Sequence, residues 1–209
     1  EKTMNNLVTF HNYLDSKYKT IAEKIKIIND QLSSIEYKNG TYIEIAAVPT
    51  DDNSIDQFKE QLKSCFANIA GISDAYTEER FLEVKKLLDE FKSNENQKIA
   101  WTEKVTDVRN WRVYNAVEKY KTDGTVKEFY SGSNAKSGGQ KERLAYTILA
   151  TSLAYQFGLV QNESKSKSFR FVVIDEAFSK SDDESTQFGL KLFDKLHLQL
   201  LVVTPMQKI

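Results

Sequence analysis

A serine, two glycines and a glutamine stand directly before a long helix-forming run: Ser137, Gly138, Gly139 and Gln140. Glycines let the backbone approach a ligand closely, and the first turn of a helix offers unpaired N–H groups and the positive end of the helix dipole. Ser137 adds a hydroxyl group. These features are typical of an anion site, and phosphate is the natural anion. Taken alone, the same residues fit an ordinary loop that caps a helix.

Two carboxylates, Asp175 and Glu176, directly follow the apolar run at 171–174. A continuous apolar run predicts a strand that is buried on both faces of a parallel sheet. Open α/β sheets bind ligands at the carboxyl ends of such strands. An aspartate there can hold Mg²⁺, usually through water, and the adjacent glutamate can orient and deprotonate an attacking water molecule. The alternative is an acidic pair that ends a strand by chance.

The elements around these residues alternate between helix and strand. A helix is predicted to follow Gln140, and a shorter helix is predicted over residues 182–193. The run at 198–205 predicts a second buried strand. The resulting order of helix, strand with carboxylates, helix and strand is that of an α/β crossover.

The first 35 residues carry the strongest periodicity of the chain. Apolar residues recur at steps of three and four from Leu7 to Ile35, and no glycine or proline interrupts them. The average step of nearly 3.5 residues predicts a coiled-coil helix, which needs a partner helix. The alternative is an amphipathic helix that lies on a globular core, for which a period of about 3.6 residues suffices.

Between these regions the sequence predicts both helices and strands. The predicted elements are a strand over 41–49, a helix from 55 to 69 with an N-cap signal at 51–54, a second helix over 81–91, and β-rich runs at 111–120 and 125–130. The dipeptide Asp123-Gly124 between the last two runs predicts a hairpin. We expect four aromatic residues to pack in the core or the hairpin, the alternative being that they stack on nucleic-acid bases. They are Trp101, Trp111, Tyr114 and Tyr120.

Composition and charge exclude several classes of protein. A chain of 209 residues that is 40% hydrophobic can bury a core, so it is not globally disordered, and 8 glycines and 2 prolines exclude a fibrous chain. The formal net charge of −1 gives no global basic field, so contact with nucleic acid requires a local patch or a partner protein. Lys165, Lys167 and Arg170 are a candidate patch, for which a solvated loop is the alternative.

Cysteine and histidine usage limits the chemistry further. The chain has a single cysteine, Cys65, so an internal disulfide is excluded, which is typical of a reducing cytoplasmic compartment. We expect Cys65 to be a small buried apolar side chain. His11 and His197 are far apart, so no His/Cys metal site is predicted, and His197 is expected at the surface or a helix end. No apolar run approaches the roughly 20 residues of a membrane span, and no signal peptide opens the chain, so no membrane partner is expected. Because the chain begins with Glu1, we expect it to be a fragment of a longer protein.

Together, the two chemical motifs resemble those of ABC-type ATPases. The residues SGGQ (137–140) resemble the ABC signature, and FVVIDE (171–176) resembles a Walker B strand with its catalytic glutamate. Asp182, seven positions after Asp175, matches the D-loop aspartate. With the heptad helix at the N-terminus, the chain resembles the SMC-like ATPases over essentially its whole length. Longer stretches, at 105–111, 136–159 and 169–186, resemble the SbcC/MukB-like group, above all the JetC family of Wadjet anti-plasmid systems.

The resemblance implies an α/β fold, the C-terminal lobe of an ABC-type ATPase head with a coiled-coil arm stub. Residues 1–38 would be the base of the arm and residues 39–209 the lobe. Two heads would sandwich two ATP molecules. The signature residues, Ser137, Gly138, Gly139 and Gln140, would contact the γ-phosphate bound on the opposite head. Asp175 would support Mg²⁺, Glu176 would activate the hydrolytic water, and Asp182 would sit at the dimer interface.

The resemblance also implies a cellular role and partners. In Wadjet systems, ATP cycling drives DNA loop extrusion together with a kleisin subunit, a KITE-type subunit and a nuclease subunit. The expected partners of this chain are therefore its own N-terminal half-head, a second head, those subunits and DNA. One alternative is an SbcC-like DNA-repair ATPase that partners a nuclease. Another is a half-head that keeps the fold but no longer hydrolyses ATP.

Three departures from the family pattern limit what the resemblance transfers. The phosphate-binding loop GxxxxGK[ST] is absent, because no glycine of the chain is followed by lysine and then serine or threonine. The chain alone should therefore bind ATP poorly, and it should be inactive without the N-terminal half that carries the loop. Lys136 replaces the leucine that usually precedes SGGQ. Pro205 stands where many ABC proteins carry the switch histidine, so the role of that histidine is not transferred.

Overall fold

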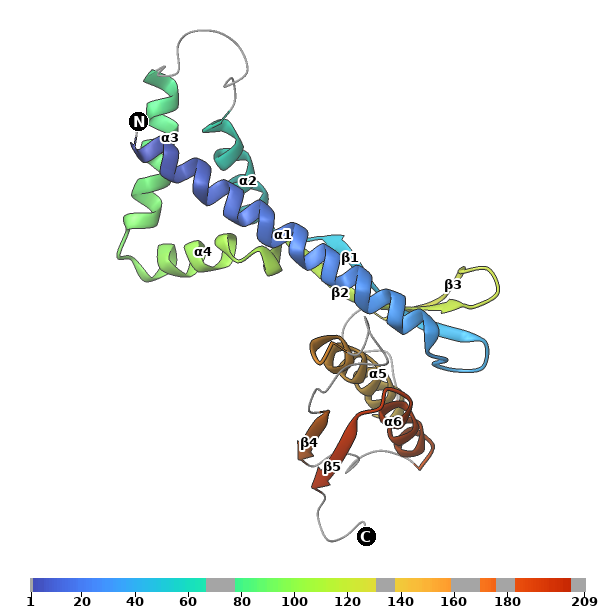
Figure 1. Cartoon of the computed structure of the whole chain (residues 1–209). Coiled ribbons are helices and arrows are strands. Elements are labelled where there is room, and N and C mark those ends of the chain that lie inside the picture. The colour runs from blue at the N-terminus through green and yellow to red at the C-terminus, as the bar shows by residue number, and fades with distance from the viewer. Residues whose placement is uncertain (1, 67–77, 131–137, 159–169, 176–182, 204–209) are drawn as a thin grey trace. The chain divides into compact units, whose positions relative to one another are not determined.

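The computed structural model describes residues 2–66, 78–130, 138–158, 170–175 and 183–203 (Figure 1). The chain divides into two compact units, Glu1–Glu23 with Ala47–Tyr114 and Lys24–Ala46 with Asn115–Ile209. Helix α1 (Lys2–Ser34) and strands β1 (Thr41–Pro49) and β2 (Arg112–Tyr120) contribute residues to both units. The mixture of helices and small sheets confirms the predicted α/β class and is compatible with a lobe of an ATPase head.

The first unit is helical. Its elements are the N-terminal part of α1, α2 (Asn53–Ser64), α3 (Glu78–Lys92), α4 (Asn96–Thr106) and the short 3₁₀ helix η1 (Val108–Trp111). Each of them sends apolar side chains into one core. The buried members are Leu7, Leu14, Ile55, Phe58, Leu62, Cys65, Val84, Leu87, Val105 and Val108. The burial of Cys65 confirms the sequence-based expectation for this side chain.

Aromatic rings hold the centre of this core together. The ring of Phe58 lies 6.0 Å from that of Trp101 and 6.5 Å from that of Trp111, measured between centroids. The indole N–H of Trp111 donates a hydrogen bond of 2.8 Å to the carbonyl of Val105. The prediction that the two tryptophans pack in the core is therefore confirmed, whereas Tyr114 and Tyr120 lie on β2 with exposed side chains.

Helix α2 begins at the N-cap that its sequence predicts. The carboxylate of Asp52 accepts a hydrogen bond of 3.0 Å from the backbone N–H of Ser54, which satisfies one of the unpaired donors at the helix start. The same carboxylate is ion-paired with Lys104 of α4. The hydrogen bonds from Lys104 and Ser54 lower the pKa of Asp52 to about 2, so this carboxylate stays charged well into the acid range.

The long N-terminal helix forms as predicted, and its apolar seam packs on the chain itself. In the first unit, Leu7 and Leu14 enter the core described above. In the second unit, Leu32 joins a core with Ile43 and Ala116. Within the described residues, these seam side chains are buried as those of an amphipathic helix on a globular core would be, and the coiled-coil arm of residues 1–38 stays a prediction. Among the described residues, no helix combines the length and the apolarity that a membrane span requires.

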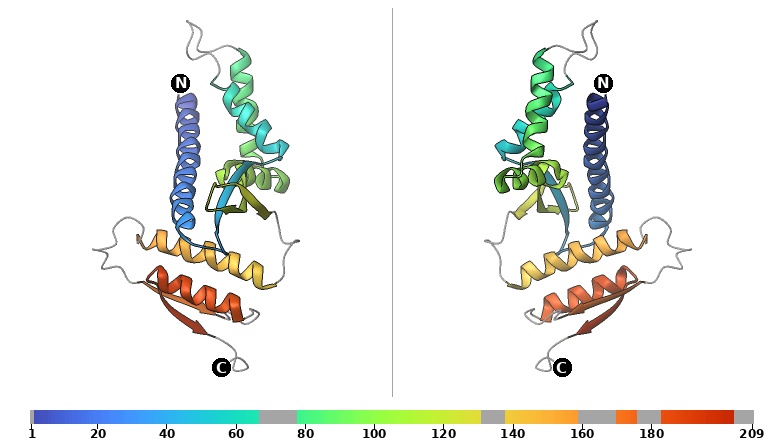
Figure 2. Two further views of the ribbon diagram at one scale, coloured as in Figure 1. Left: turned by 90° about the vertical axis from the view of Figure 1, so that its right-hand side faces the viewer. Right: turned by 90° about the vertical axis from the view of Figure 1, so that its left-hand side faces the viewer.

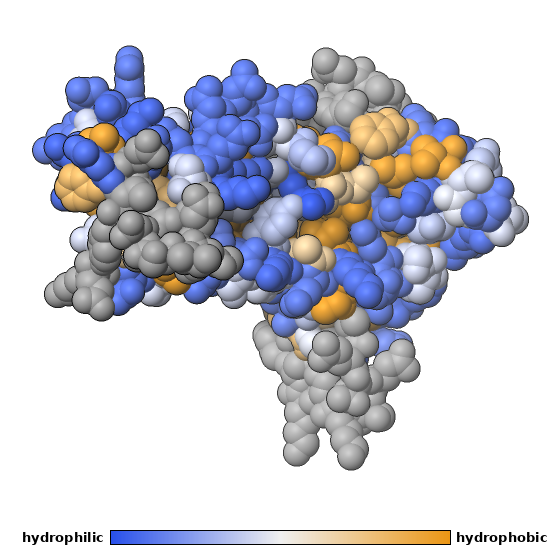
Figure 3. Space-filling view, turned by 90° about the horizontal axis from the view of Figure 1, so that it is seen from above, coloured by the Kyte–Doolittle hydropathy of each residue, from blue (hydrophilic) through white to orange (hydrophobic). Residues whose placement is uncertain are grey.

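A three-stranded sheet of order β1-β2-β3 belongs largely to the second unit. Strands β2 and β3 (Val126–Tyr130) pair antiparallel, which confirms the predicted hairpin. Gly124 has a φ angle of +71°, which favours glycine, and the Asp123 carboxylate accepts a hydrogen bond from the N–H of Thr125. On the face that Figure 3 shows, hydrophilic side chains predominate, and hydrophobic ones gather in the right half of the view (Figure 3).

The second sheet carries the predicted carboxylate strand. Strands β4 (Phe171–Asp175) and β5 (Gln199–Val203) pair in parallel, as predicted. Helices α5 (Gly138–Gln156) and α6 (Asp183–Lys195) lie side by side on one side of this sheet (Figures 1 and 2). The inner residues of the strands pack on these helices in a core that includes Val172, Leu192 and Phe193.

The prediction that the strand at 171–174 is buried on both faces, and that the strand at 198–205 is also buried, is wrong for the described residues. Val173 is 56% exposed and Leu201 is 48% exposed, and they are direct neighbours in the register of the sheet. Phe171 and Val203 are exposed on the same face. The apolar run arises because both faces of the strands carry apolar side chains, but the described helices cover only one face. The other face is left without a covering layer in the described residues.

Helix α6 ends in a Schellman motif built around a histidine. The N–H of His197 donates to the carbonyl of Asp194, and the N–H of Leu198 donates to that of Phe193, at 2.8 and 2.9 Å. His197 has a φ angle of +55°, in the left-handed region that glycine adopts without strain. The expectation that this histidine stands at a helix end is confirmed.

Replacing His197 with glycine is expected to stabilise the chain by about 0.5–1 kcal/mol, because glycine removes the strain of the left-handed conformation. The gain is limited because glycine also has more conformational freedom in the unfolded chain. Urea denaturation followed by circular dichroism measures the change. The control is His197→Ala, which keeps a Cβ atom and should give no gain; equal stabilisation by alanine would contradict the explanation.

Candidate functional site

The predicted metal-binding carboxylate lies at the end of a strand. Asp175 is the last residue of β4, is exposed, and is the register partner of Val203 at the end of β5. The two strands are parallel, so their carboxyl ends share one edge of the sheet, where α/β proteins bind ligands. Glu176, the predicted catalytic residue, is the next residue in the chain but lies outside the described residues.

The predicted anion site lies at the start of helix α5. Gly138, Gly139 and Gln140 are the first three residues of this helix, so their backbone belongs to its first turn. Backbone N–H groups in the first turn have no partner within the helix and attract anions. Ser137 and Lys136 precede the helix and lie outside the described residues. The roles of these residues toward a nucleotide stay predictions.

The predicted D-loop aspartate, Asp182, also lies outside the described residues. Helix α6 begins directly after it, at Asp183. The three motifs are thus attached to three neighbouring elements of the second unit: the signature to the start of α5, the carboxylates to the end of β4, and the D-loop to the start of α6. All three elements share one core, to which Ala150, Val172 and Leu192 contribute.

An arginine that sequence reasoning missed joins the two helices near these motifs. Arg143 of α5 donates a hydrogen bond of 2.8 Å from Nη2 to Oε1 of Glu184 in α6. Its guanidinium carbon also lies 4.7 Å from the ring centroid of Phe188, also in α6. A signal was present in the sequence: Arg143 falls on the helix face of the buried Thr147 and Ala150, where a charged residue is unexpected.

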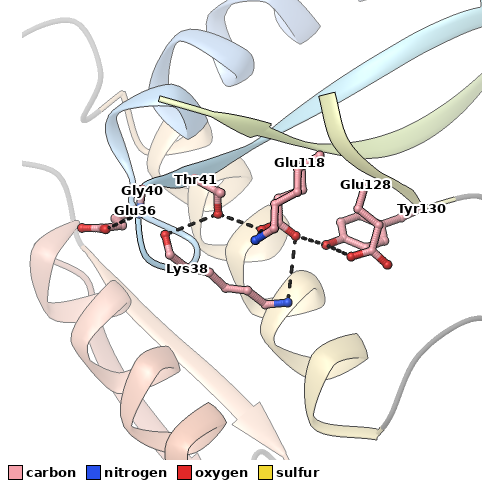
Figure 4. A network of polar contacts seen from close by, with 8 residues as sticks. Glu36, Lys38, Gly40, Thr41, Glu118, Glu128 and Tyr130 are labelled. Atoms are coloured by element: carbon pink, nitrogen blue, oxygen red, sulfur yellow. Dashed lines mark hydrogen bonds and ion pairs between the residues drawn. The ribbon is translucent and has the colours of Figure 1, made fainter. Parts of the chain in front are cut away.

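A second feature that sequence reasoning missed is a buried glutamate in strand β2. Glu118 is fully buried, and its carboxylate accepts hydrogen bonds from the hydroxyls of Thr41 and Tyr130 and from Nζ of Lys127 (Figure 4). The distances are 2.8 Å from Thr41 and 2.9 Å from Lys127. Nζ of Lys38 also lies 3.9 Å from Oε2 of Glu118.

The hairpin register explains why Glu118 needs so many partners. Glu118 lies directly opposite Glu128 of β3, and like charges in that arrangement destabilise a hairpin. Burial raises the pKa of Glu118, but the hydrogen bonds from Tyr130, Lys127 and Thr41 outweigh it, so the pKa lies below its ordinary value. The carboxylate therefore remains charged at neutral pH. A pairing of two glutamates across a predicted hairpin was the signal available in the sequence.

The same network affects two buried tyrosines. Burial, together with the hydrogen bond to Glu118, raises the pKa of Tyr130. Burial also raises the pKa of Tyr37 to about 12, with a further contribution from the negative charge of Glu118. Both phenols are therefore neutral near pH 7, which makes them hydrogen-bond donors and packing groups rather than acids or bases.

Other potential sites within the described residues are few. No group of three or more histidine, cysteine, aspartate or glutamate side chains there is arranged to hold a metal ion. A cavity of about 400 Å³ opens in the first unit, where its lining includes Leu7, Phe10, Leu88 and Phe91. It belongs to a different unit from the three motifs and has an apolar lining, so it is not a candidate for the nucleotide site.

Comparison with protein families agrees with the resemblance of the motifs. The family described as SbcC/RAD50-like, Walker B motif, matches residues 103–195. The matched stretch contains the Glu118 hairpin, the start of α5, strand β4 with Asp175, and all of α6. No curated protein matches the chain significantly. The family match supports an SMC-like ABC ATPase and suggests ATPase activity of the SMC/Rad50 type, with the Mg²⁺ and nucleotide dependence that a Walker B motif implies.

Proposed function

We propose that this chain is the C-terminal half of an SMC-like ATPase head, which hydrolyses ATP when two heads dimerise. One observation carries the proposal. The start of α5 with its glycines and the end of β4 with its aspartate belong to one compact α/β core, within a stretch that matches a Walker B family. An ordinary helix cap and a chance acidic pair would have no reason to occur together in this arrangement.

Each motif would have a separate role in the reaction. Ser137, Gly138, Gly139 and Gln140 would contact the γ-phosphate of ATP bound on the opposite head, and Asp182 would lie at the interface between the heads. Asp175 fits Mg²⁺, because it offers an exposed carboxylate oxygen at the carboxyl edge of a parallel sheet and Mg²⁺ prefers such ligands together with water. When bound, Mg²⁺ would neutralise phosphate charge.

Glu176 would act on the attacking water. A carboxylate next to the metal-supporting aspartate can accept a hydrogen bond from that water and take its proton. The chain contains no phosphate-binding loop GxxxxGK[ST], so ATP would be held by an N-terminal half-head that carries it. The chain by itself would then bind ATP weakly and would not turn it over.

Reconstitution of the head tests the proposal. The chain is produced alone and joined to the N-terminal segment of the protein from which it comes, to give the assembled head. We expect the assembled head to hydrolyse ATP and the chain alone not to. Because two heads form each site, the rate of hydrolysis should rise more steeply than linearly with the concentration of heads. Equal activity of the chain alone, or rates strictly proportional to head concentration across the dimerisation range, would contradict the proposal.

The uncovered face of the β4–β5 sheet supports an N-terminal half-head as a partner. Val173 and Leu201 are adjacent, apolar and about half exposed, and an apolar sheet face of this kind is normally covered by another layer. We propose that the N-terminal half supplies that layer. This pairing would bring the phosphate-binding loop into the same head as Asp175.

Replacing Val173 with glutamate is expected to weaken association of the two half-heads about 100-fold or more when they are made as separate chains, because a carboxylate would be buried without a partner. Isothermal titration calorimetry measures the affinity. The control is Val113→Glu, which places the same change on an exposed valine of the first unit. A Val173→Glu chain that binds like the unchanged one would show that this face is not the contact.

For the cellular role, we propose DNA loop extrusion in plasmid defence, with kleisin, KITE-type and nuclease subunits as partners. The support is the similarity of the stretches at 105–111, 136–159 and 169–186 to the JetC family. A second candidate is DNA repair together with a nuclease, which the SbcC/RAD50-like description of the matching family favours. Plasmid loss in cells that carry the intact gene cluster distinguishes them. Plasmid loss that requires Glu176 supports a role in defence. Unchanged plasmid retention, together with sensitivity to DNA breaks of cells that carry a Glu176 variant, supports a role in repair.

A further inference from the structure

We infer that Arg143 is a positioning residue, which fixes the signature end of helix α5 against helix α6 and thereby sets where the signature meets the nucleotide of the second head. The inference rests on the proposed function, because it concerns the geometry of that same site. It assigns a role to a residue outside the signature, the Walker B strand and the D-loop aspartate.

The contacts of Arg143 are concentrated at the ends of the two helices that adjoin the motifs. Arg143 stands five residues after Gly138, which is about 7.5 Å along the helix axis. Its ion-pair partner, Glu184, is the second residue of α6 and therefore lies next to the segment that contains Glu176 and Asp182. The ion pair thus joins α5 and α6 near their N-terminal ends. A small displacement of one helix there would move the signature relative to Asp175 and Glu176.

The guanidinium is held by stacking more than by its ion pair. The side chain of Arg143 is only 12% exposed, whereas that of Glu184 is 84% exposed, so water screens their attraction. The guanidinium carbon instead lies over the ring of Phe188, 4.7 Å from its centroid, in a cation–π contact. A planar guanidinium can stack on the ring and donate to a carboxylate at once, which a lysine ammonium cannot do.

Phe188 is itself fixed from another direction. Its ring contacts that of Tyr37 edge-on, with centroids 6.2 Å apart and an interplanar angle of 87°. Tyr37 is fully buried and follows the end of α1 by three residues. Arg143 therefore packs on a ring whose position is determined by the segment after the N-terminal helix. The position of α5 within the second unit is therefore fixed through Phe188 and Tyr37 as well as through α6.

The rest of the α5–α6 interface does not need a charge. It includes apolar side chains further along the two helices, such as Ala150, Leu192 and Phe193. Helix packing would therefore survive without Arg143, while the first turns of α5 would lose the polar and cation–π link that Arg143 makes to α6. Loss of this link should impair the contact made with the second head and spare nucleotide binding, because ATP is held by the loop of its own head.

The test compares head dimerisation with nucleotide binding. In assembled heads that carry Glu176→Gln, so that ATP-bound dimers accumulate, sedimentation equilibrium measures ATP-driven dimerisation. Binding of a fluorescent ATP analogue is measured at head concentrations below dimerisation. We expect Arg143→Ala and Arg143→Lys to weaken dimerisation about tenfold while nucleotide affinity stays within about twofold. If Arg143→Lys dimerises as weakly as Arg143→Ala, the stacking of the guanidinium on Phe188, rather than the positive charge alone, supports dimerisation.

Two control variants separate this role from other effects. Glu184→Gln removes only the exposed ion pair and should leave dimerisation unchanged. Arg109→Ala removes an exposed, ion-paired arginine of the first unit and should also have no effect. Arg143→Met keeps the apolar bulk of the side chain, so it replaces Arg143→Ala in the test if the alanine variant does not fold. The midpoint of thermal unfolding of each variant is compared with that of the parent.

Each outcome decides a separate question. Variants of Arg143 that dimerise like the parent, or that lose nucleotide affinity in parallel with dimerisation, overturn the positioning role and leave the proposed function standing. A parent that does not dimerise with ATP overturns the proposed function, and the role of Arg143 with it. Weakened dimerisation with unchanged nucleotide affinity supports both.

Discussion

Glu176→Gln is expected to lower ATP turnover of the assembled head about 100-fold or more, the loss typical of a residue that activates the attacking water. Glutamine has nearly the same size and can still hydrogen-bond to the water, but it cannot take up its proton. Nucleotide binding should persist, because Asp175 is unchanged and the phosphate-binding loop belongs to the other half of the head. Single-turnover hydrolysis and ATP-analogue affinity, measured on the same preparation, separate the two effects.

A matched control excludes a general effect of lost negative charge. Asp194, near the end of α6, is exposed, and Asp194→Asn should leave turnover unchanged. Normal turnover in the Glu176→Gln head would show that the catalytic base is another residue. Loss of ATP binding together with turnover would show that Glu176 supports the nucleotide rather than the water.

Glu118→Ala is expected to destabilise the chain by about 3 kcal/mol, the lower end of the cost of breaking a buried ion pair. The variant removes the carboxylate that accepts the shorter hydrogen bonds of the buried Thr41 and Tyr130 hydroxyls. Each hydroxyl keeps a longer hydrogen bond, from Thr41 to the carbonyl of Lys38 at 3.3 Å and from Tyr130 to Glu128 at 3.2 Å. The cost stays at the lower end because Lys127 and Lys38 are partly exposed and can turn toward water. Urea denaturation followed by circular dichroism gives the free energy of unfolding.

The strand opposite provides the control for this prediction. Glu128→Ala removes the like charge that faces Glu118 together with the 3.2 Å hydrogen bond from Tyr130. These two effects oppose each other, so stability should change by less than about 0.5 kcal/mol. Tyr130→Phe removes the hydroxyl that donates to Glu118 and to Glu128 and should cost about 1–2 kcal/mol, since Glu118 keeps Lys127 and Thr41. A Glu118→Ala change as small as that of Glu128→Ala would mean that the network does not stabilise the fold.

The contribution of Glu118 should also depend on pH. Its pKa in the folded chain lies below the ordinary value of 4.5, so the folded state binds protons less readily than the unfolded state. The stability that its charge provides is therefore complete above about pH 4.5 and is lost as the pH falls through the lowered pKa. The difference in stability between the unchanged chain and Glu118→Gln should shrink correspondingly in acid.

The local features of this chain were predictable from the sequence. Residues of one helix or hairpin turn are close in sequence, so their preferences show in the spacing of apolar residues and in glycine positions. On that basis α1, the hairpin at Gly124 and the parallel pairing of β4 with β5 were all predicted correctly. The chemically distinctive residues, Ser137 and Asp175 among them, could likewise be identified from residue type and spacing.

The tertiary structure alone decided which side chains are buried and which partners they meet. Glu118 contacts Thr41 across 77 positions of sequence, and Arg143 contacts Glu184 across 41. Nothing local marks such pairs, because burial depends on which distant elements cover a given face. For the same reason the apolar run that ends at Asp175 predicted a strand covered on both sides, whereas the described fold covers one. The sequence of this protein thus specifies its elements and its chemical groups, and long-range packing determines their surroundings.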